Sequence, residues 1–114
     1  MNQLSKVMEA LDYMTAVYYK FTVNHARCFL YVASHRDEII ETRDLVQALG
    51  MTQSSLNRSL RSLAKRSYIH EEGFGLLEIN TSPNDERQRV VTLSPKGLEL
   101  AMRMEEKIYG RSNS

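Results

Sequence analysis

The sequence has few residues that cross-link a chain or interrupt a helix: among 114 residues there are one cysteine and two prolines. It also has no tryptophan. The single cysteine, Cys28, cannot form an internal disulfide and provides no CxxC metal-binding pair. No apolar run approaches the roughly 18 residues that a membrane-spanning helix needs. The segment 1–10 also lacks the apolar stretch of a signal peptide. We therefore expect a cytoplasmic protein that engages no membrane and folds around a hydrophobic core.

The side-chain groupings that support enzymatic catalysis are also missing. His25, His35 and His70 are far apart in the sequence, and no pair has the spacing of metal ligands. There is no glycine-rich phosphate loop, no Ser/His/Asp grouping and no paired-carboxylate site in a recognisable context. We therefore expect neither an enzyme nor a bound cofactor or metal. A lone helical cysteine such as Cys28 is typical of a small buried residue, and an oxidant-sensing role is the alternative.

Charge is balanced overall but unevenly distributed. Apolar residues make up 42% and charged residues 25%, which is typical of one globular domain, here 1–114. The net charge of +1 argues against a strongly basic nucleic-acid binder. However, the window 45–70 holds four basic residues and no acidic residue, whereas 71–79 holds three acidic residues. A binding partner responds to the local electrostatic field more than to the net charge. The window 45–70 is therefore either a binding surface or a solvated helix face.

Glycine is almost absent from the first seventy residues, where Gly50 is the one example, and both prolines come later. This predicts a helical first part and a turn-rich second part. Apolar residues at helical spacing predict amphipathic helices over 2–19 and 22–35, the second beginning at Thr22 or Asn24. We assign 1–20 as an N-terminal helix that could contribute to a dimer.

Residues 42–67 have the pattern of a helix-turn-helix. Thr42 is expected to cap a short helix, and Gly50 can end it because glycine tolerates a positive φ. Thr52 is then expected to cap a longer helix, whose buried face is marked by Leu56, Leu60 and Leu63.

After the helix-turn-helix the apolar period changes from 3.6 to 2, which predicts a β-hairpin, or wing, within 68–94. We expect strands at 76–80 and 89–93 around a polar loop at 81–88. A single short strand or turn is expected at Ile39 and Ile40.

The last helix is predicted over 95–110. Ser94 is the expected cap, Pro95 suits the first helical position, and the apolar side chains that should face the core or a partner are Leu98, Met102 and Ile108. The predicted fold is therefore mainly α with a small β-hairpin wing (α+β), a winged helix-turn-helix.

The outward face of the longer helix has the chemistry of a DNA-reading surface. Amide, hydroxyl and guanidinium groups pair with base edges, and the residues expected to do so are Gln53, Ser54, Ser55, Asn57 and Arg58. The residues expected to hold phosphate are Thr52, Arg61, Ser62, Lys65, Arg89 and Lys96. At the wing tip, Arg87 can enter the minor groove, with Asp85 orienting it through a charge-assisted bond. The alternative for these wing charges is a solvated turn.

Several of these segments together resemble the MarR family of winged-helix regulators. They are Thr42 to Gly50, Met51-Thr-Gln-Ser-Ser-Leu56, Asp85-Glu-Arg87 and Val91-Thr-Leu-Ser-Pro-Lys-Gly97. Family members carry an Asp-x-Arg at the wing tip and then a Leu-Thr/Ser-x-x-Gly step, which here is Leu93, Ser94 and Gly97. The resemblance covers about residues 22–100.

The resemblance implies a homodimer with a recognition helix in each of two major grooves and wings in the flanking minor grooves. It also implies repression of a pseudo-palindromic operator. Family chains usually run longer, with two C-terminal helices that build the dimer. A dimer of this chain would therefore rest on the first helix and a shortened last one, or be absent. A small stand-alone regulator, as found in phages and mobile elements, fits this length.

We expect a sequence-specific double-stranded DNA-binding transcriptional regulator that acts as a homodimeric repressor. The first alternative is a protein-binding winged-helix adaptor or anti-repressor without specific DNA binding. The second is a replication-associated winged-helix DNA-binding protein. A small-molecule effector is a further conceivable partner, but no residue pattern supports one.

Overall fold

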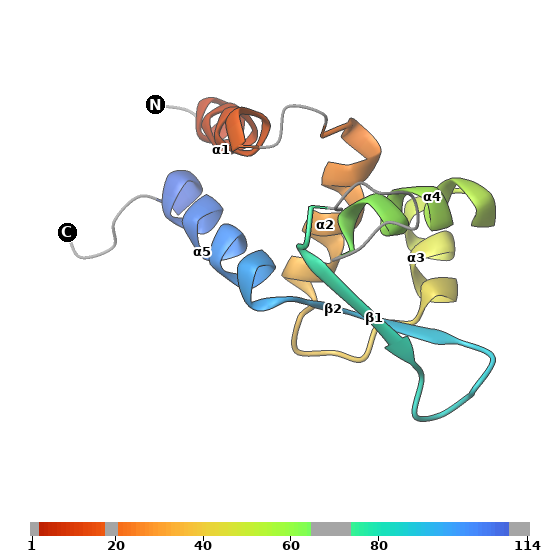
Figure 1. Ribbon diagram of the computed structural model, residues 1–114. Coiled ribbons are helices and arrows are strands. Elements are labelled where there is room, and N and C mark those ends of the chain that lie inside the picture. Colours follow the sequence, from red (N-terminus) through yellow and green to blue (C-terminus); the bar gives the residue numbers. More distant parts are fainter. Residues whose placement is uncertain (1–2, 18–20, 65–73, 110–114) are drawn as a thin grey trace.

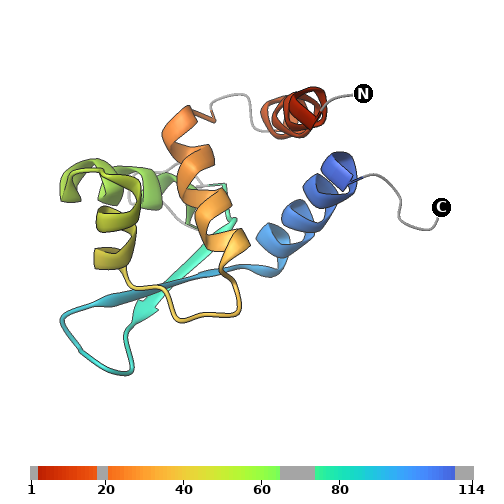
Figure 2. The same ribbon diagram turned by 180° about the vertical axis from the view of Figure 1, so that it is seen from behind.

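The computed structural model describes residues 3–17, 21–64 and 74–109. Within these ranges the chain forms helices and one antiparallel hairpin, shown in Figure 1 and from behind in Figure 2. In chain order they are α1 (Gln3–Val17), α2 (Val23–Ser34), α3 (Thr42–Leu49), α4 (Gln53–Leu63), β1 (Leu77–Thr81), β2 (Arg89–Leu93) and α5 (Pro95–Tyr109). The predicted mainly α fold with a hairpin wing is confirmed.

Helix α2 lies at the centre of the molecule and packs against α3, α4, α5 and β2. It begins at Thr22, one of the two predicted caps: the Thr22 hydroxyl accepts from the His25 backbone N–H at 3.1 Å. Phe29 and Val32 are fully buried. Leu30, on the same helix, is 39% exposed.

Helices α3 and α4 form the predicted helix-turn-helix, with one correction. The N-cap of α3 is Glu41 and not Thr42, because Glu41 has extended backbone angles and its N–H donates to Asp44 Oδ2 at 2.9 Å. Gly50 has a φ of 65° and its N–H donates to the Val46 carbonyl, so the predicted glycine C-cap is confirmed. Thr52 caps α4 as predicted.

Strands β1 and β2 pair in register from Leu77 opposite Leu93 to Thr81 opposite Arg89. β2 has its predicted bounds, and β1 begins one residue later than predicted. The segment predicted as a short strand or turn, at Ile39 and Ile40, leads into an isolated bridge in which Glu41 pairs with Val90. The Val91 N–H donates to the Ile40 carbonyl at 2.9 Å. The hairpin is therefore joined to the start of α3. Residues 68–72, at the start of the segment predicted as the wing, lie outside the described residues.

Helix α5 begins as predicted, at a Ser-Pro step. The Ser94 hydroxyl accepts from the Gly97 N–H at 2.9 Å, and Pro95 occupies the first helical position. Gly97 lies so close to the backbone of Leu76 that a Cβ at this position would overlap the Leu76 carbonyl oxygen. A close approach of backbone to backbone thus fixes α5 against the start of the hairpin.

Helix α1 packs along α5 at the end of the molecule away from α3 and α4 (Figures 1 and 2). Ala10 and Met14 of α1 join the core, and the ammonium of Lys107 lies 6.0 Å from the ring centre of Tyr13. The apolar residues left exposed on these two helices are Leu4, Val7, Met8, Leu98 and Met102. Leu98 and Met102 therefore do not enter the core of this chain, and Ile108 packs against it partly buried. No helix in the described part of the chain is long and apolar enough to cross a bilayer.

Candidate nucleic-acid interface

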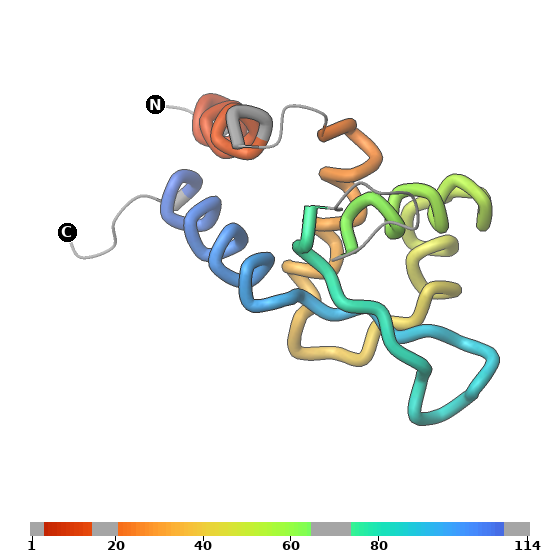
Figure 3. The backbone as a smooth tube through the Cα atoms, in the orientation of Figure 1, coloured from red at the N-terminus to blue at the C-terminus, as the bar shows by residue number. Residues whose placement is uncertain are grey.

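One end of the molecule carries α3, α4 and the hairpin. The tube in Figure 3 shows the loop between β1 and β2 projecting beyond the helices at this end, away from α1. Helix α4 and the tip of the hairpin thus both lie at this end of the molecule. This arrangement could contact two neighbouring grooves of an elongated ligand.

The start of α4 is fixed by its cap. The Thr52 hydroxyl accepts from the Ser55 N–H at 3.1 Å, so the first turn of the helix is set by a local bond. The free N–H groups of such a turn favour anions. Thr52 itself is exposed, as a phosphate contact would require.

Helix α2 holds the turn that precedes α4. Nη2 of Arg27 donates to the Leu49 carbonyl at 2.6 Å and so satisfies an end of α3 that lacks a helical partner. Cys28 lies beside Met51, with 3.9 Å between the sulfurs. Burial raises the pKa of the Cys28 thiol, which disfavours the reactive thiolate. This placement matches the interpretation of Cys28 as a buried core residue.

Helix α4 turns its leucines inward and its polar groups outward. Within α4, the exposed members of the predicted base-reading and phosphate sets are Gln53, Ser54, Asn57, Arg58 and Arg61. Ser55 and Ser62 are partly buried, and the Ser62 hydroxyl donates to the Arg58 carbonyl at 3.4 Å. The predicted inner face is confirmed, since Leu56, Leu60 and Leu63 are all buried. Lys65 lies outside the described residues.

Two amides are paired on the exposed face. Nε2 of Gln53 donates to Oδ1 of Asn57 at 3.1 Å, so the two side chains lie side by side one helical turn apart. Arg58 follows directly, and α4 contains no acidic residue. The face therefore offers adjacent amides and a guanidinium without a carboxylate that would repel phosphate, which is the chemistry of base-edge recognition.

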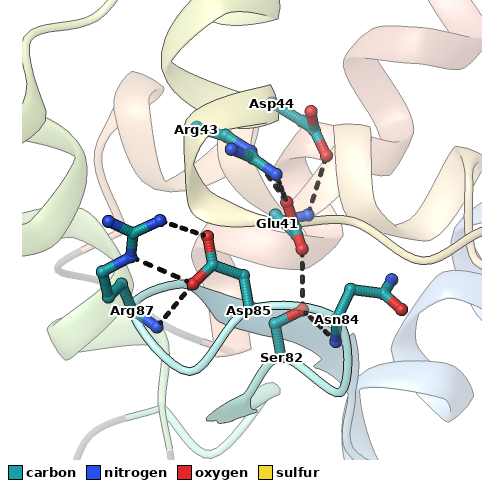
Figure 4. Close-up of polar contacts among 7 residues, drawn as sticks. All are labelled: Glu41, Arg43, Asp44, Ser82, Asn84, Asp85 and Arg87. Carbon is teal, nitrogen blue, oxygen red and sulfur yellow. Dashed lines mark hydrogen bonds and ion pairs between the residues drawn. The ribbon is translucent and has the colours of Figure 1, made fainter.

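The hairpin loop is built around Asp85 and Arg87, as predicted. Oδ1 of Asp85 accepts from the Arg87 backbone N–H at 3.0 Å and from Arg87 Nε at 3.2 Å (Figure 4). These bonds from Arg87 hold the pKa of the Asp85 carboxyl below its ordinary value. The Arg87 side chain is 89% exposed. Asp85 thus orients a guanidinium that still faces solvent.

The other two predicted phosphate contacts lie further from the loop. Arg89 is exposed at the start of β2, next to the loop. Lys96 is exposed at the start of α5, beside Gly75, at the end of the hairpin opposite to Arg87. The structure therefore groups Arg89 with the wing tip, and it does not bring Lys96 to that part of the surface.

Sequence reasoning missed a cluster where the wing loop meets the start of α3. Glu41 is only 6% exposed, and its carboxylate binds Arg43 of α3 and Ser82 of the wing (Figure 4). The available signal was the acidic residue three positions after Glu41: Asp44 marks a capping box that begins at Glu41. The contact with Ser82 had no such signal, because the two residues are far apart in the sequence.

Within 3–17, 21–64 and 74–109, no group of three or more His, Cys, Asp and Glu side chains could hold a metal ion. His25 instead packs between the rings of Phe21 and Phe74, with centroids 5.4 and 5.3 Å away. Burial lowers the pKa of His25, which favours its neutral form. His25 is partly buried, and its Nδ1 accepts from the Thr22 N–H at 3.0 Å, so the side chain contributes to the cap of α2.

The fold is that of solved MarR-type transcription regulators. The Staphylococcus aureus MepR–DNA complex is 16% identical and matches with a TM-score of 0.72, over 93% of this chain and 78% of that one. A mutant of MarR from E. coli is 18% identical, with a TM-score of 0.67 over 94% of this chain and 70% of that one. A MepR mutant from a multidrug-resistant S. aureus clinical isolate is 18% identical, with a TM-score of 0.66 over 89% of this chain.

The chain spans 63% of the length of that last protein. No protein-family model matches the sequence, and no curated protein matches it. At these identities the likeness establishes a shared fold. The predicted winged helix-turn-helix, and the resemblance to MarR-type regulators in fold, are confirmed.

Proposed function

We propose that this chain is a MarR-family transcription regulator that binds specific sequences in double-stranded DNA and acts as a homodimeric repressor. The observation that carries the proposal is the exposed, acid-free face of α4 beside a projecting wing whose arginine is held by Asp85. One of the proteins with this fold is described in complex with DNA. Function itself comes from these side chains, since one fold serves many functions.

The roles follow from the chemistry of each group. On α4, the residues proposed to read base edges in the major groove are Gln53, Ser54, Ser55, Asn57 and Arg58. The groups proposed to hold phosphate are Thr52, Arg61, Ser62, Lys65, Arg89 and Lys96. Arg87 enters the minor groove, where the negative potential is strongest, and Asp85 orients it.

A homodimer accounts for the apolar residues exposed on α1 and α5. On α1, Leu4 is 80% and Met8 60% exposed; on α5, Leu98 is 41% and Met102 54% exposed. Large apolar side chains gathered on neighbouring helices are typical of an interface. A two-fold partner would bury the same residues on both copies, and would repeat α4 and the wing on a second half-site.

The test is a selection of bound duplexes from a random DNA pool, followed by a salt titration of binding to the selected site. The four cationic members of the phosphate set, Arg61, Lys65, Arg89 and Lys96, predict a slope of log K against log salt of about −3 to −4 per protomer. Competition with unrelated duplex then measures specificity. A slope near zero, or equal affinity for selected and unrelated duplexes, contradicts the proposal.

The matched control is Arg103→Ala on α5. Arg103 is 56% exposed and pairs with Glu99 at 3.5 Å, so this variant removes one positive charge away from α4 and the wing. It should leave the selected sequence unchanged once gel filtration shows an unaltered oligomeric state. A wild-type chain that elutes as a monomer and shifts no DNA would favour the protein-binding alternative, with the groove of about 420 Å³ along Pro95, Leu98 and Met102 as the docking surface.

A further inference from the structure

The buried carboxylate of Glu41 lies where the helix-turn-helix meets the hairpin. Its side chain is 8% exposed. A buried carboxylate is costly unless its oxygens are satisfied by hydrogen bonds or cations. Both oxygens of Glu41 are satisfied, and by partners from two different elements: Oε1 binds Arg43 of α3, and Oε2 accepts from Ser82 of the wing.

On the wing side, the contact continues into the loop. The Ser82 hydroxyl donates to Glu41 Oε2 at 2.7 Å and accepts from the Asn84 N–H at 3.2 Å. The Ser82 N–H donates to the Gln88 carbonyl at 2.9 Å, which closes the loop. Ser82 is 3% exposed, so water does not compete for these bonds. A continuous chain of hydrogen bonds thus runs from Glu41 to the loop that carries Arg87.

On the helix side, Glu41 holds an arginine that faces the same loop. Nε and Nη2 of Arg43 both lie 2.8 Å from Glu41 Oε1, and the Arg43 side chain is 61% exposed. The positive charge of Arg43 also contributes to lowering the pKa of Asp85.

Backbone contacts join the strands of the wing to the start of α3. A two-stranded hairpin is marginally stable in water by itself. At the start of α3 it gains the Glu41–Val90 bridge, which lies in the strands and not in the loop. The Glu41–Ser82 bond is the contact on this side that reaches the loop itself.

We infer that Glu41 is a positioning residue, whose carboxylate fixes the wing loop and Arg43 relative to α4 and so sets where Arg87 meets DNA. Only the part of the inference that concerns DNA binding rests on the proposed function. Glu41 does not itself touch DNA, because it is buried. Its effect on binding must therefore pass through the loop and the arginines.

The first experiment measures the free protein. Amide hydrogen exchange is compared between wild type and Glu41→Gln, which keeps the size of the side chain and removes its charge. The N–H groups of Ser82, Asn84, Arg87 and Gln88 should exchange about tenfold faster, while those of Phe29 and Val32 in α2 keep their rates. Unchanged loop rates overturn the inference.

The second experiment is a double-mutant cycle on affinity for the selected DNA. Glu41→Gln should weaken binding about tenfold in the wild-type background and less than about twofold in the Arg87→Ala background. Equal losses in the two backgrounds would mean that Glu41 acts through general stability, and would overturn the inference.

Ser82→Ala provides a second variant that leaves the buried charge paired with Arg43. It removes the donor to Glu41 and the acceptor for Asn84, so it should reproduce both effects even where Glu41→Gln folds poorly. If the wild-type chain binds no DNA at all, the proposed function fails. The exchange experiment then still decides whether Glu41 holds the wing.

Discussion

Gly97 of α5 lies against the carbonyl oxygen of Leu76, with no space for a Cβ between them. Two hydrogen bonds join the same two segments of the chain. The Ser94 N–H donates to the Leu76 carbonyl at 3.0 Å, and the Ser94 hydroxyl donates to the Gly75 carbonyl at 2.6 Å. The entry to α5 and the entry to β1 therefore form one tightly packed junction.

Gly97→Ala should destabilise the protein by about 1–3 kcal/mol, because backbone on both sides of the contact must shift to admit a methyl group. Alanine otherwise favours a helix, so a loss of stability isolates the steric effect. Urea unfolding measures the change. Glu99→Ala, on an exposed position of the same helix, is the control and should change stability little; a Gly97→Ala variant as stable as wild type would disprove the packing account.

Arg58→Ala should relax the sequence preference at one base pair by about 1–3 kcal/mol, since a guanidinium discriminates guanine through two hydrogen bonds. Competition among duplexes that differ at single positions measures this. Arg103→Ala should leave the preference at every position as it is. An Arg58→Ala variant with the wild-type base preference would remove Arg58 from the base-reading set.

The Asp85 carboxyl should titrate below the ordinary pKa of an aspartate, and Arg87→Ala should raise its pKa toward that ordinary value. Because the folded pKa is the lower one, the stabilising effect is present above the unfolded pKa and is lost as pH falls through the folded pKa. An NMR titration of the Asp85 carboxyl in both proteins measures the shift. Equal pKa values in wild type and variant would contradict the bonds described between these residues.

Met102→Glu should shift a homodimer toward monomer, because it places a carboxylate in the apolar surface of α5 that a second copy would cover. Sedimentation across a range of concentrations measures the equilibrium. The affinity for a palindromic site should fall with it, while the affinity for a half-site stays. Lys107→Gln is the charge-changing control. An unchanged oligomeric state would locate the interface elsewhere.

Local chemistry made the helix-turn-helix predictable. Gly50 and Thr52 act through backbone angles and bonds to residues three or four positions away, which a sequence displays directly. β2 was equally clear from its β-branched residues. The cap of α3 was misassigned because threonine is a common cap, whereas Glu41 takes that position while its side chain reaches the wing.

What could not be predicted depends on tertiary contacts. Helical spacing marks Leu98 and Met102 as apolar, but it does not distinguish a core from a surface that another protein covers. The Glu41–Ser82 bond joins residues 41 positions apart, and no local pattern encodes it. The base-reading and phosphate-binding roles remain predictions, although the exposure of most of these side chains is consistent with them.

The bonds between Arg87 and Asp85 also bear on the entropy of association. A free arginine side chain loses up to about 2 kcal/mol of rotamer freedom when a ligand immobilises it. Here part of that freedom is already lost in the unbound protein, because Nε and Nη2 of Arg87 both donate to Asp85 while the side chain stays 89% exposed. The wing should therefore meet its target in a shape close to the bound one, so that less order has to be created when the complex forms.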